Sequence, residues 1–186
     1  MKRLLLKNKN LYTTVDDEDF DELNKYTWFA MWDKSSKSFY AASTFKDNNG
    51  KPHHQLLHRF ILKVTNPNIL VDHENRDTLC NTKDNLRKST QTENQQNSIA
   101  RKGTSKYKGV CKTSDNKRWR SQIRANGKKL HLGETHSEIE AAILYDIAAR
   151  KYHGKFARLN FPDQSFLPLA SVGMVEGVNE SDAPMF

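Results

Sequence analysis

Short apolar runs separated by polar turns dominate the first half of the chain. The runs have the β-rich composition of short strands and cover residues 4–6, 11–15, 28–32 and 39–44. Turn-forming residues at 33–37 predict a hairpin between the last two runs. After the second run, acidic residues followed by Phe20 and Leu23 at helical spacing predict a short helix over residues 17–25. A further turn precedes an apolar run at residues 56–62.

The second half carries a clearer pattern, in which three strands are followed by one helix. The strands are predicted at residues 107–112, 118–125 and 128–133, and Asn126-Gly127 between the last two is a strong hairpin signal. The helix is predicted to begin at the capping box of Ser137 and to end at Gly154. Its apolar positions recur at helical spacing and are expected to pack on the sheet: Ala141, Leu144, Tyr145, Ala148 and Tyr152.

The middle strand of this predicted sheet has one apolar face and one polar face. Because side chains alternate along a strand, one face receives Trp119, Ser121, Ile123 and Ala125, and the other receives Arg118, Arg120, Gln122 and Arg124. In the third strand, Leu130 and Leu132 face inward, which turns Lys129 and His131 outward. Arg suits guanine edges and Gln suits adenine edges, so the open face has the chemistry to read the major groove of DNA.

The positive charge of the chain is concentrated in the same segment. The chain has 186 residues, a formal net charge of +8 and a mean hydropathy of −0.83. Residues 101–162 hold 15 of the 30 basic residues and 5 of the 22 acidic ones, as expected of a module that binds nucleic acid. A lysine-rich solvated surface is the plainer alternative. Residues 98–106 have the composition of a linker, and the acidic residues 163–186 are predicted to be a disordered tail.

Other features of the composition exclude several classes of protein. No run approaches 18 apolar residues, so no transmembrane helix is predicted. The apolar run after Met1 is too short for a signal peptide. Cys80 and Cys111 cannot build a disulfide framework or a Cys-rich zinc site. We therefore expect an intracellular protein, neither secreted nor bound to a membrane, without a disulfide-linked partner.

A dispersed pattern over residues 105–162 has a known counterpart. The pattern consists of Tyr107-Lys108-Gly109-Val110, Trp119, Ile123-Arg124, Leu132-Gly133, Ala141-Ala142, Tyr145-Asp146, Ala148-Ala149 and Leu159-Asn160-Phe161-Pro162. It resembles the APETALA2-type DNA-binding domain of plant ethylene-response factors. The resemblance implies such a domain over residues 107–162, in which a three-stranded antiparallel sheet packs on one helix and lies in the major groove.

The same resemblance implies which residues contact DNA. These positions are Lys108, Gly109, Cys111, Gln122, Arg124, Lys129 and His131. Cys111 and His131 stand where the plant domains carry Arg and Trp, so the plant target sequence is not carried over.

A segment rich in hydrogen-bonding side chains lies before the linker, over residues 71–97. In it Asp72 precedes His73, and Asn85 and Asn94 follow. A carboxylate beside an imidazole can hold a divalent cation while the neutral imidazole accepts a proton from water. Asn carbonyl oxygens are hard ligands that suit Mg²⁺ or Mn²⁺. On composition alone, an Asn-rich loop explains the segment equally well.

The spacing of these residues favours a catalytic interpretation. Asn85 follows His73 by twelve positions and Asn94 follows Asn85 by nine, which resembles the HNH nuclease motif of phage homing endonucleases. Residues 57–62 match the usual lead-in to that motif. The resemblance implies that His73 is the general base and that Asp72 and Asn94 bind the metal ion. It also implies that Asn85 orients His73 and braces the loop.

The resemblance further implies an α+β domain organisation. Residues 1–97 would form the HNH endonuclease domain, with 1–55 as a β-rich front and 56–97 as a ββα-metal module.

Some neighbouring residues leave alternatives open. Asn97 lies one helical turn beyond Asn94 and could share or replace its ligand role. His58 suits either a phosphate contact or a structural role beside the site. His53 and His54 are predicted to lie in a turn without a chemical role.

Together these features predict a site-directed, metal-dependent DNA endonuclease that acts as a monomer on double-stranded DNA. It would use Mg²⁺ or Mn²⁺, nick one strand, and work in the cytoplasm of a bacterial host if it is phage-encoded. The alternative is a non-enzymatic, transcription-factor-like DNA-binding protein with an inactive HNH segment. The four intact motif positions favour the nuclease, and the composition does not support a structural virion protein.

Overall fold

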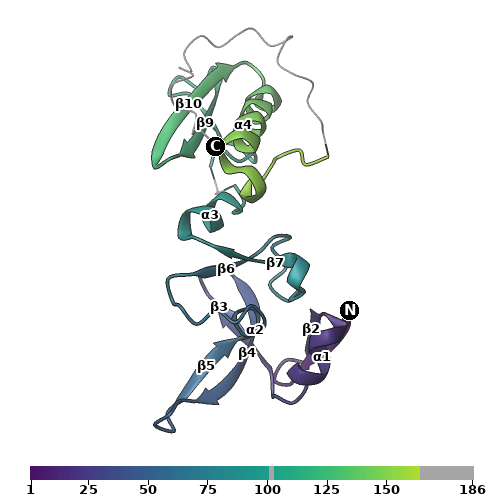
Figure 1. Ribbon diagram of the computed structural model, residues 1–186. Helices are drawn as coiled ribbons and strands as arrows, with labels where there is room; N and C mark the ends of the chain where they lie inside the picture. Colours follow the sequence, from purple (N-terminus) through teal and green to yellow (C-terminus); the bar gives the residue numbers. More distant parts are fainter. Residues whose placement is uncertain (101–102, 164–186) are drawn as a thin grey trace. The chain divides into compact units, whose positions relative to one another are not determined.

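The computed structural model describes residues 1–100 and 103–163, which fall into two compact units, Met1–Gln95 and the described residues from Gln96 onward (Figure 1). Both units combine helices with small antiparallel sheets, so the predicted α+β class is confirmed. The predicted domain boundaries stay predictions. The predicted tail beyond Asp163 lies outside the described residues, as do residues 101–102 of the predicted linker.

The first unit opens with a hairpin, a short helix and a three-stranded sheet. The elements are β1 (Lys2–Leu6), β2 (Leu11–Val15), α1 (Asp17–Leu23), β3 (Phe29–Asp33), β4 (Ser38–Lys46) and β5 (Pro52–Leu56). Strand β4 lies between β3 and β5. Inward-facing apolar residues from these elements, together with Trp28 before β3 and Leu57 after β5, form one core: Leu4, Leu6, Val15, Leu23, Trp28, Ala30, Ala41 and Leu57. The indole of Trp28 donates a hydrogen bond to the carbonyl oxygen of Leu23 at 2.8 Å and so fixes the end of α1.

The rest of this unit contains the predicted catalytic segment. Its elements are α2 (Leu57–Ile61), β6 (Leu70–His73), the 3₁₀ turn η1 (Lys83–Asn85), β7 (Leu86–Ser89) and α3 (Gln91–Gln96). Strands β6 and β7 pair antiparallel. The chain between them, residues 74–85, is called the site loop below. It joins β2 through a parallel bridge between Thr14 and Cys80, so the front and the catalytic segment form one structure.

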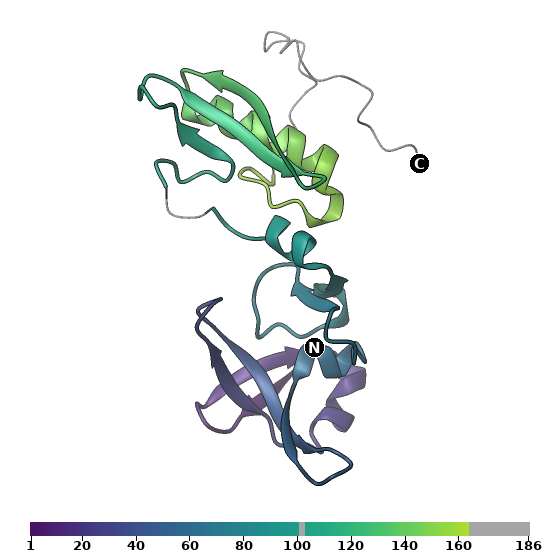
Figure 2. The ribbon, with the colours of Figure 1, turned by 90° about the vertical axis from the view of Figure 1, so that its left-hand side faces the viewer.

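The second unit is a three-stranded antiparallel sheet with one long helix across one face (Figure 2). Its elements are β8 (Val110–Lys112), β9 (Trp119–Ala125), β10 (Lys128–Thr135), α4 (Glu138–His153) and the 3₁₀ turn η2 (Gly154–Phe156). The Ser137 hydroxyl accepts the backbone N–H of Glu140 at 3.4 Å, as the capping box predicts. Tyr145, Ala148 and Ala149 of α4 pack on Ile123 of β9, which buries the apolar face.

Several predicted boundaries differ from the structure. Strand β8 begins at residue 110 and not at 107, and β10 continues to residue 135 through a bulge between His131 and Gly133. The prediction that His53 and His54 lie in a turn is wrong, because both belong to strand β5. This polar segment is a strand because it pairs with β4. Its own sequence has little of the apolar alternation that predicts a strand.

Candidate active site and nucleic-acid interface

Asp72 and His73 form the end of strand β6 and are both buried, with 6% and 5% of their surface exposed. Asp72 lies opposite Arg87 in the β6–β7 ladder. The guanidinium of Arg87 contacts one carboxylate oxygen, Oδ2, through Nε at 2.9 Å and through Nη2 at 2.8 Å. Since a buried carboxylate is costly unless it is paired, this contact with Arg87 offsets part of the cost of burying Asp72 beside His73.

Asn85 closes the site loop at its C-terminal end. Its side-chain oxygen accepts the backbone N–H of Asn75 at 3.0 Å, and its side-chain nitrogen donates to the carbonyl oxygen of Cys80 at 2.7 Å. Its backbone oxygen accepts the N–H of Glu74 at 2.9 Å. These bonds join both ends of the site loop and its middle. The further role expected of Asn85, the orientation of His73, stays a prediction.

The imidazole of His73 contacts a residue that the sequence did not single out. Its Nε2 lies 3.2 Å from Oδ1 of Asn81, whose own side chain is buried. The ring also packs edge-on against His58, with 5.2 Å between centroids, and lies 6.2 Å from the ring of Tyr40. Asn81 is one of several Asn residues in the segment, so no sequence signal separated it from its neighbours. His58 is thus a buried neighbour of His73, which agrees with a structural role of His58 beside the site.

Burial keeps both histidine rings uncharged. It lowers the pKa of His58 to about 3, with smaller contributions from the nearby His73 and Arg59. Burial also lowers the pKa of His73 below its ordinary value, although Asn81 and Asp72 favour the charged form. At neutral pH, His73 is therefore a neutral imidazole that can accept a proton.

We expect the first unit to lose stability as the pH falls below about 6.5, the ordinary pKa of histidine. Below that pH the unfolded chain binds protons that the folded His58 and His73 do not. Each group then removes up to about 1.4 kcal/mol per pH unit, until its folded pKa is reached. Urea unfolding of the full chain in EDTA between pH 7.5 and pH 5 measures this slope. His58→Gln should reduce this slope by the contribution of one titrating group, up to about 1.4 kcal/mol per pH unit. An unchanged slope in that variant contradicts the prediction.

Helix α3 carries the remaining residue of the predicted site. A reciprocal cap begins the helix, because Thr90 donates its backbone N–H to the Glu93 carboxylate at 2.7 Å and its hydroxyl accepts the N–H of Glu93 at 3.3 Å. Asn94 follows on the first turn and is half buried. Asn97 is buried and belongs to the second unit, so the choice between Asn94 and Asn97 stays open.

The two residues predicted to bind the metal ion are both oxygen donors. Asp72 supplies a carboxylate and Asn94 an amide oxygen, which suit Mg²⁺ or Mn²⁺. Within residues 1–100 and 103–163, no group of three or more His, Cys, Asp or Glu residues is arranged to hold a metal ion.

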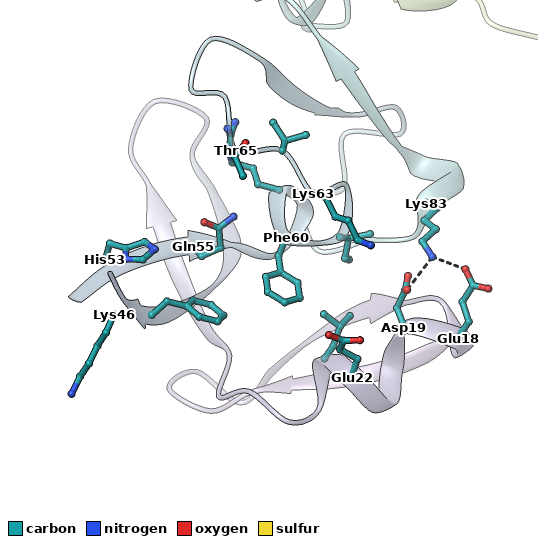
Figure 3. A pocket seen from close by; sticks show the side chains of 15 residues that line it. Glu18, Asp19, Glu22, Lys46, His53, Gln55, Phe60, Lys63, Thr65 and Lys83 are labelled. Atoms are coloured by element: carbon teal, nitrogen blue, oxygen red, sulfur yellow. Dashed lines mark hydrogen bonds and ion pairs between the residues drawn. The ribbon is translucent and has the colours of Figure 1, made fainter. Parts of the chain in front are cut away.

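A hollow of about 700 Å³ lies elsewhere on the first unit, and Asp72 and His73 do not line it (Figure 3). Phe60 forms part of its wall, and Lys83 on one side donates to Glu18 and Asp19 of α1 at 2.5 and 2.9 Å. These contacts hold Lys83, the first residue of η1, against α1, and η1 ends at Asn85. Because charges of both signs line the hollow and partly pair with each other, we assign no phosphate site to it.

In the second unit, the predicted polar face of the sheet carries exposed basic side chains. Arg118, Arg124, Lys129 and His131 are exposed, and Gln122 and Cys111 are half buried. Glu134 lies beside this face, where its Oε1 pairs with Nη2 of Arg120 at 2.8 Å and lies 3.7 Å from Nε2 of His131. Among the described residues, no helix is both long and apolar enough to cross a membrane.

Lys108 and Gly109 have structural partners. The Lys108 ammonium donates to the backbone oxygen of Ser98 at 2.7 Å and to that of Gln96. Gly109 has a φ of +77°, and a Cβ there would lie 1.9 Å from a ring carbon of Tyr145. Their expected DNA contacts stay predictions, and packing alone requires the glycine.

Gly109→Ala is expected to destabilise the second unit by about 2–4 kcal/mol, because it adds a steric clash to an unfavourable backbone conformation. Gly127→Ala is the matched control, since Gly127 also has a positive φ, +75°, but has open space around its Cα. The control should cost about 1–2 kcal/mol, from the backbone alone. Urea unfolding followed by Trp119 fluorescence measures both values. Equal losses in the two variants contradict the packing argument.

The fold and the site together define a two-part protein. One part holds a buried Asp–His pair on a two-stranded ladder that a helix follows, and the other presents a basic face on a three-stranded sheet. No protein-family model matches the chain. An uncharacterized HNH endonuclease of Acanthamoeba polyphaga mimivirus is 30% identical over 158 residues, which are 84% of this chain and 79% of that protein. The chain therefore belongs to the HNH endonuclease family.

Plant proteins match a smaller part of the chain. An AP2-like ethylene-responsive transcription factor of Arabidopsis thaliana is 47% identical over 70 residues, or 37% of this chain and 20% of that protein. An ethylene-responsive transcription factor of the same plant, WRI1, is 41% identical over 68 residues, or 36% of this chain and 16% of that protein. The chain thus combines an HNH endonuclease relationship with a partial match to AP2-type transcription factors.

Proposed function

We propose that this protein is a divalent-metal-dependent endonuclease that cuts one strand of double-stranded DNA at sites selected by its basic sheet. The observation that carries the proposal is the buried Asp72–His73 pair, held from two sides by Arg87 and Asn81. Burial costs a charged or polar group its hydration, so a buried pair of this kind is typical of a functional site. The relationship to HNH endonucleases supports the same assignment.

In the proposed reaction, His73 accepts a proton from the water that attacks the scissile phosphate. Its lowered pKa favours the neutral ring that this step needs at neutral pH. Arg87 pairs with the Asp72 carboxylate and fixes its orientation. Asn85 braces the site loop through its hydrogen bonds to Asn75 and Cys80.

Asp72 and Asn94 would hold the metal ion in a ββα arrangement formed by β6, β7 and α3. A bound divalent cation supplies charge neutralisation at the phosphate and at the 3′ leaving oxygen. The products would then carry 5′-phosphate and 3′-hydroxyl ends. With one such site among the residues that the structure describes, a monomer would cut one strand per encounter, in the interior of a host cell.

The exposed face of β9 and β10 would provide sequence recognition. Arg124 and Gln122 have side chains suited to base edges, whereas Lys129 suits a phosphate. The partial similarity to AP2-type transcription factors supports a role of this sheet in DNA recognition. Arg120 is better suited to a structural role, since Glu134 already pairs with it.

The division between recognition and chemistry can be tested in the full chain. Arg124→Ala should weaken binding to the preferred site by about 1–3 kcal/mol and relax base preference there. Lys129→Ala should instead weaken binding to all sequences and lower the salt slope by about one unit. Both variants should cut at the wild-type rate when DNA is saturating, because the proposed catalytic residues belong to the other unit.

Gel-shift titrations over a range of salt concentrations, followed by single-turnover cleavage, measure these effects. Wild-type DNA affinity in Arg124→Ala would contradict the recognition role of the sheet. Specific binding without cleavage by the wild-type chain would favour the alternative, a DNA-binding protein with an inactive HNH segment.

A further inference from the structure

A buried chain of hydrogen bonds links the N-terminal hairpin to the imidazole of His73. The Thr13 hydroxyl on β2 donates to the backbone oxygen of Leu79 at 2.8 Å. The side-chain nitrogen of Asn81 donates to the same hydroxyl at 2.8 Å, and the side-chain oxygen of Asn81 lies 3.2 Å from Nε2 of His73. Thr13 is completely buried and Asn81 is 1% exposed. The proposed catalytic histidine is thus joined to a strand sixty residues earlier in the sequence.

The direction of each bond in this chain is determined by chemistry. A hydroxyl has one hydrogen, and Thr13 gives it to the Leu79 carbonyl oxygen, so the Thr13 oxygen must accept from Asn81. The Asn81 nitrogen also donates to the backbone oxygen of Thr78 at 3.3 Å. Rotating the Asn81 amide by half a turn would place its oxygen against that carbonyl oxygen. The amide oxygen of Asn81 is therefore directed at His73.

This orientation determines the tautomer of His73. An amide oxygen only accepts hydrogen bonds, so Nε2 of His73 must carry the hydrogen that it donates to Asn81. In the neutral ring, the proton-accepting lone pair is then on Nδ1.

We propose that Thr13 and Asn81 are positioning residues that hold His73 in its Nε2–H tautomer, so that Nδ1 accepts the proton of the attacking water. This inference rests on the proposed nuclease function, for which His73 is the base. Backbone bonds reinforce the arrangement, because Thr14 donates to Leu79 and accepts from Asn81, both at 2.8 Å. The N-terminal hairpin is accordingly part of the catalytic scaffold.

Three single substitutions in the full chain separate this role from simple packing. Thr13→Val keeps the shape of the side chain and removes the hydroxyl. Thr13→Ser keeps the hydroxyl and removes a methyl group. Thr14→Val is the matched control, because it makes the same change one residue along the strand, at a side chain outside the hydrogen-bonded chain.

Two readouts are needed for each protein. Nitrogen-15 NMR of the histidine rings, recorded in EDTA at neutral pH, identifies the His73 tautomer without reference to activity. Single-turnover cleavage of DNA in Mg²⁺ measures the chemical step, and a gel shift measures DNA affinity. Near-ultraviolet circular dichroism confirms that each variant is folded.

We expect the Nε2–H tautomer in the wild-type chain, in Thr13→Ser and in Thr14→Val. Thr13→Val should give a mixture of tautomers and a cleavage rate lower by about 10- to 100-fold, with unchanged DNA affinity. An Nδ1–H tautomer in the wild-type chain overturns the proposal even if no variant folds. A folded Thr13→Val protein with wild-type cleavage also overturns it. A wild-type chain that has the expected tautomer but does not cut DNA contradicts the nuclease function and leaves the hydrogen-bond assignment intact.

Discussion

Arg87→Met is expected to destabilise the first unit by about 3–5 kcal/mol, because it removes the Arg87 ion pair from the buried carboxylate of Asp72. The Arg87 side chain is 13% exposed and that of Asp72 is 6% exposed, so water cannot replace the lost ion pair. Methionine retains much of the apolar stem of arginine, and the loss therefore reports mainly on charge. Urea unfolding of the full chain, with Trp28 and Trp32 reporting on the first unit, measures the change.

Arg120→Met provides a matched control in the second unit. Arg120 pairs with Glu134 at the same 2.8 Å distance, but its side chain is 42% exposed. Solvent screening reduces such a pair to about 0–1 kcal/mol. A second substitution, Asp72→Asn in the Arg87→Met background, should recover part of the lost stability, since it removes the unpaired charge. Equal losses in Arg87→Met and Arg120→Met would show that burial does not strengthen the Asp72 pair.

His73→Ala is expected to lower the cleavage rate by about 10²- to 10⁴-fold, the usual contribution of a general base. DNA affinity should stay at the wild-type value, because the proposed recognition residues belong to the other unit. His53→Ala is the control, since His53 is an exposed residue of β5 in the same unit. Single-turnover cleavage at saturating DNA compares the two variants. Undiminished cleavage by a folded His73→Ala protein excludes His73 as the base.

The best-predicted parts of the fold are those determined by local sequence. Asn126 and Gly127 both adopt positive φ, +51° and +75°, which is the conformation that their hairpin turn requires. Ser137 begins α4 through its own side chain. Both features depend on residues within a few positions of each other, so pattern and turn chemistry were sufficient to locate them.

Tertiary contacts account for what the sequence did not reveal. Strand β5 exists through its pairing with β4. The Asn81 amide that contacts His73 donates a hydrogen bond to Thr13, which lies 68 residues earlier in the sequence. Arg87 also was not singled out, although its place opposite Asp72 in a predicted ββ pair offered a signal.

The candidate site was also predictable only in part from the sequence. The motif spacing drew attention to Asp72, His73 and Asn85, and the structure places all three at the junction of β6, the site loop and β7. Asn94 lies on the following helix, and its ligand role stays a proposal. The spacing could not supply the residues that orient this group, because a motif records catalytic positions and not the network that holds them.

Conversion of supercoiled plasmid by the full chain, with Mg²⁺ or with excess EDTA, tests the central claim most directly. With Mg²⁺, nicked circles should accumulate before linear DNA, and DNA ligase should reseal them because the proposed ends are 5′-phosphate and 3′-hydroxyl. With EDTA, the plasmid should remain supercoiled. Equal conversion in EDTA, or no conversion with Mg²⁺ or Mn²⁺, would contradict the assignment of this protein as a metal-dependent endonuclease.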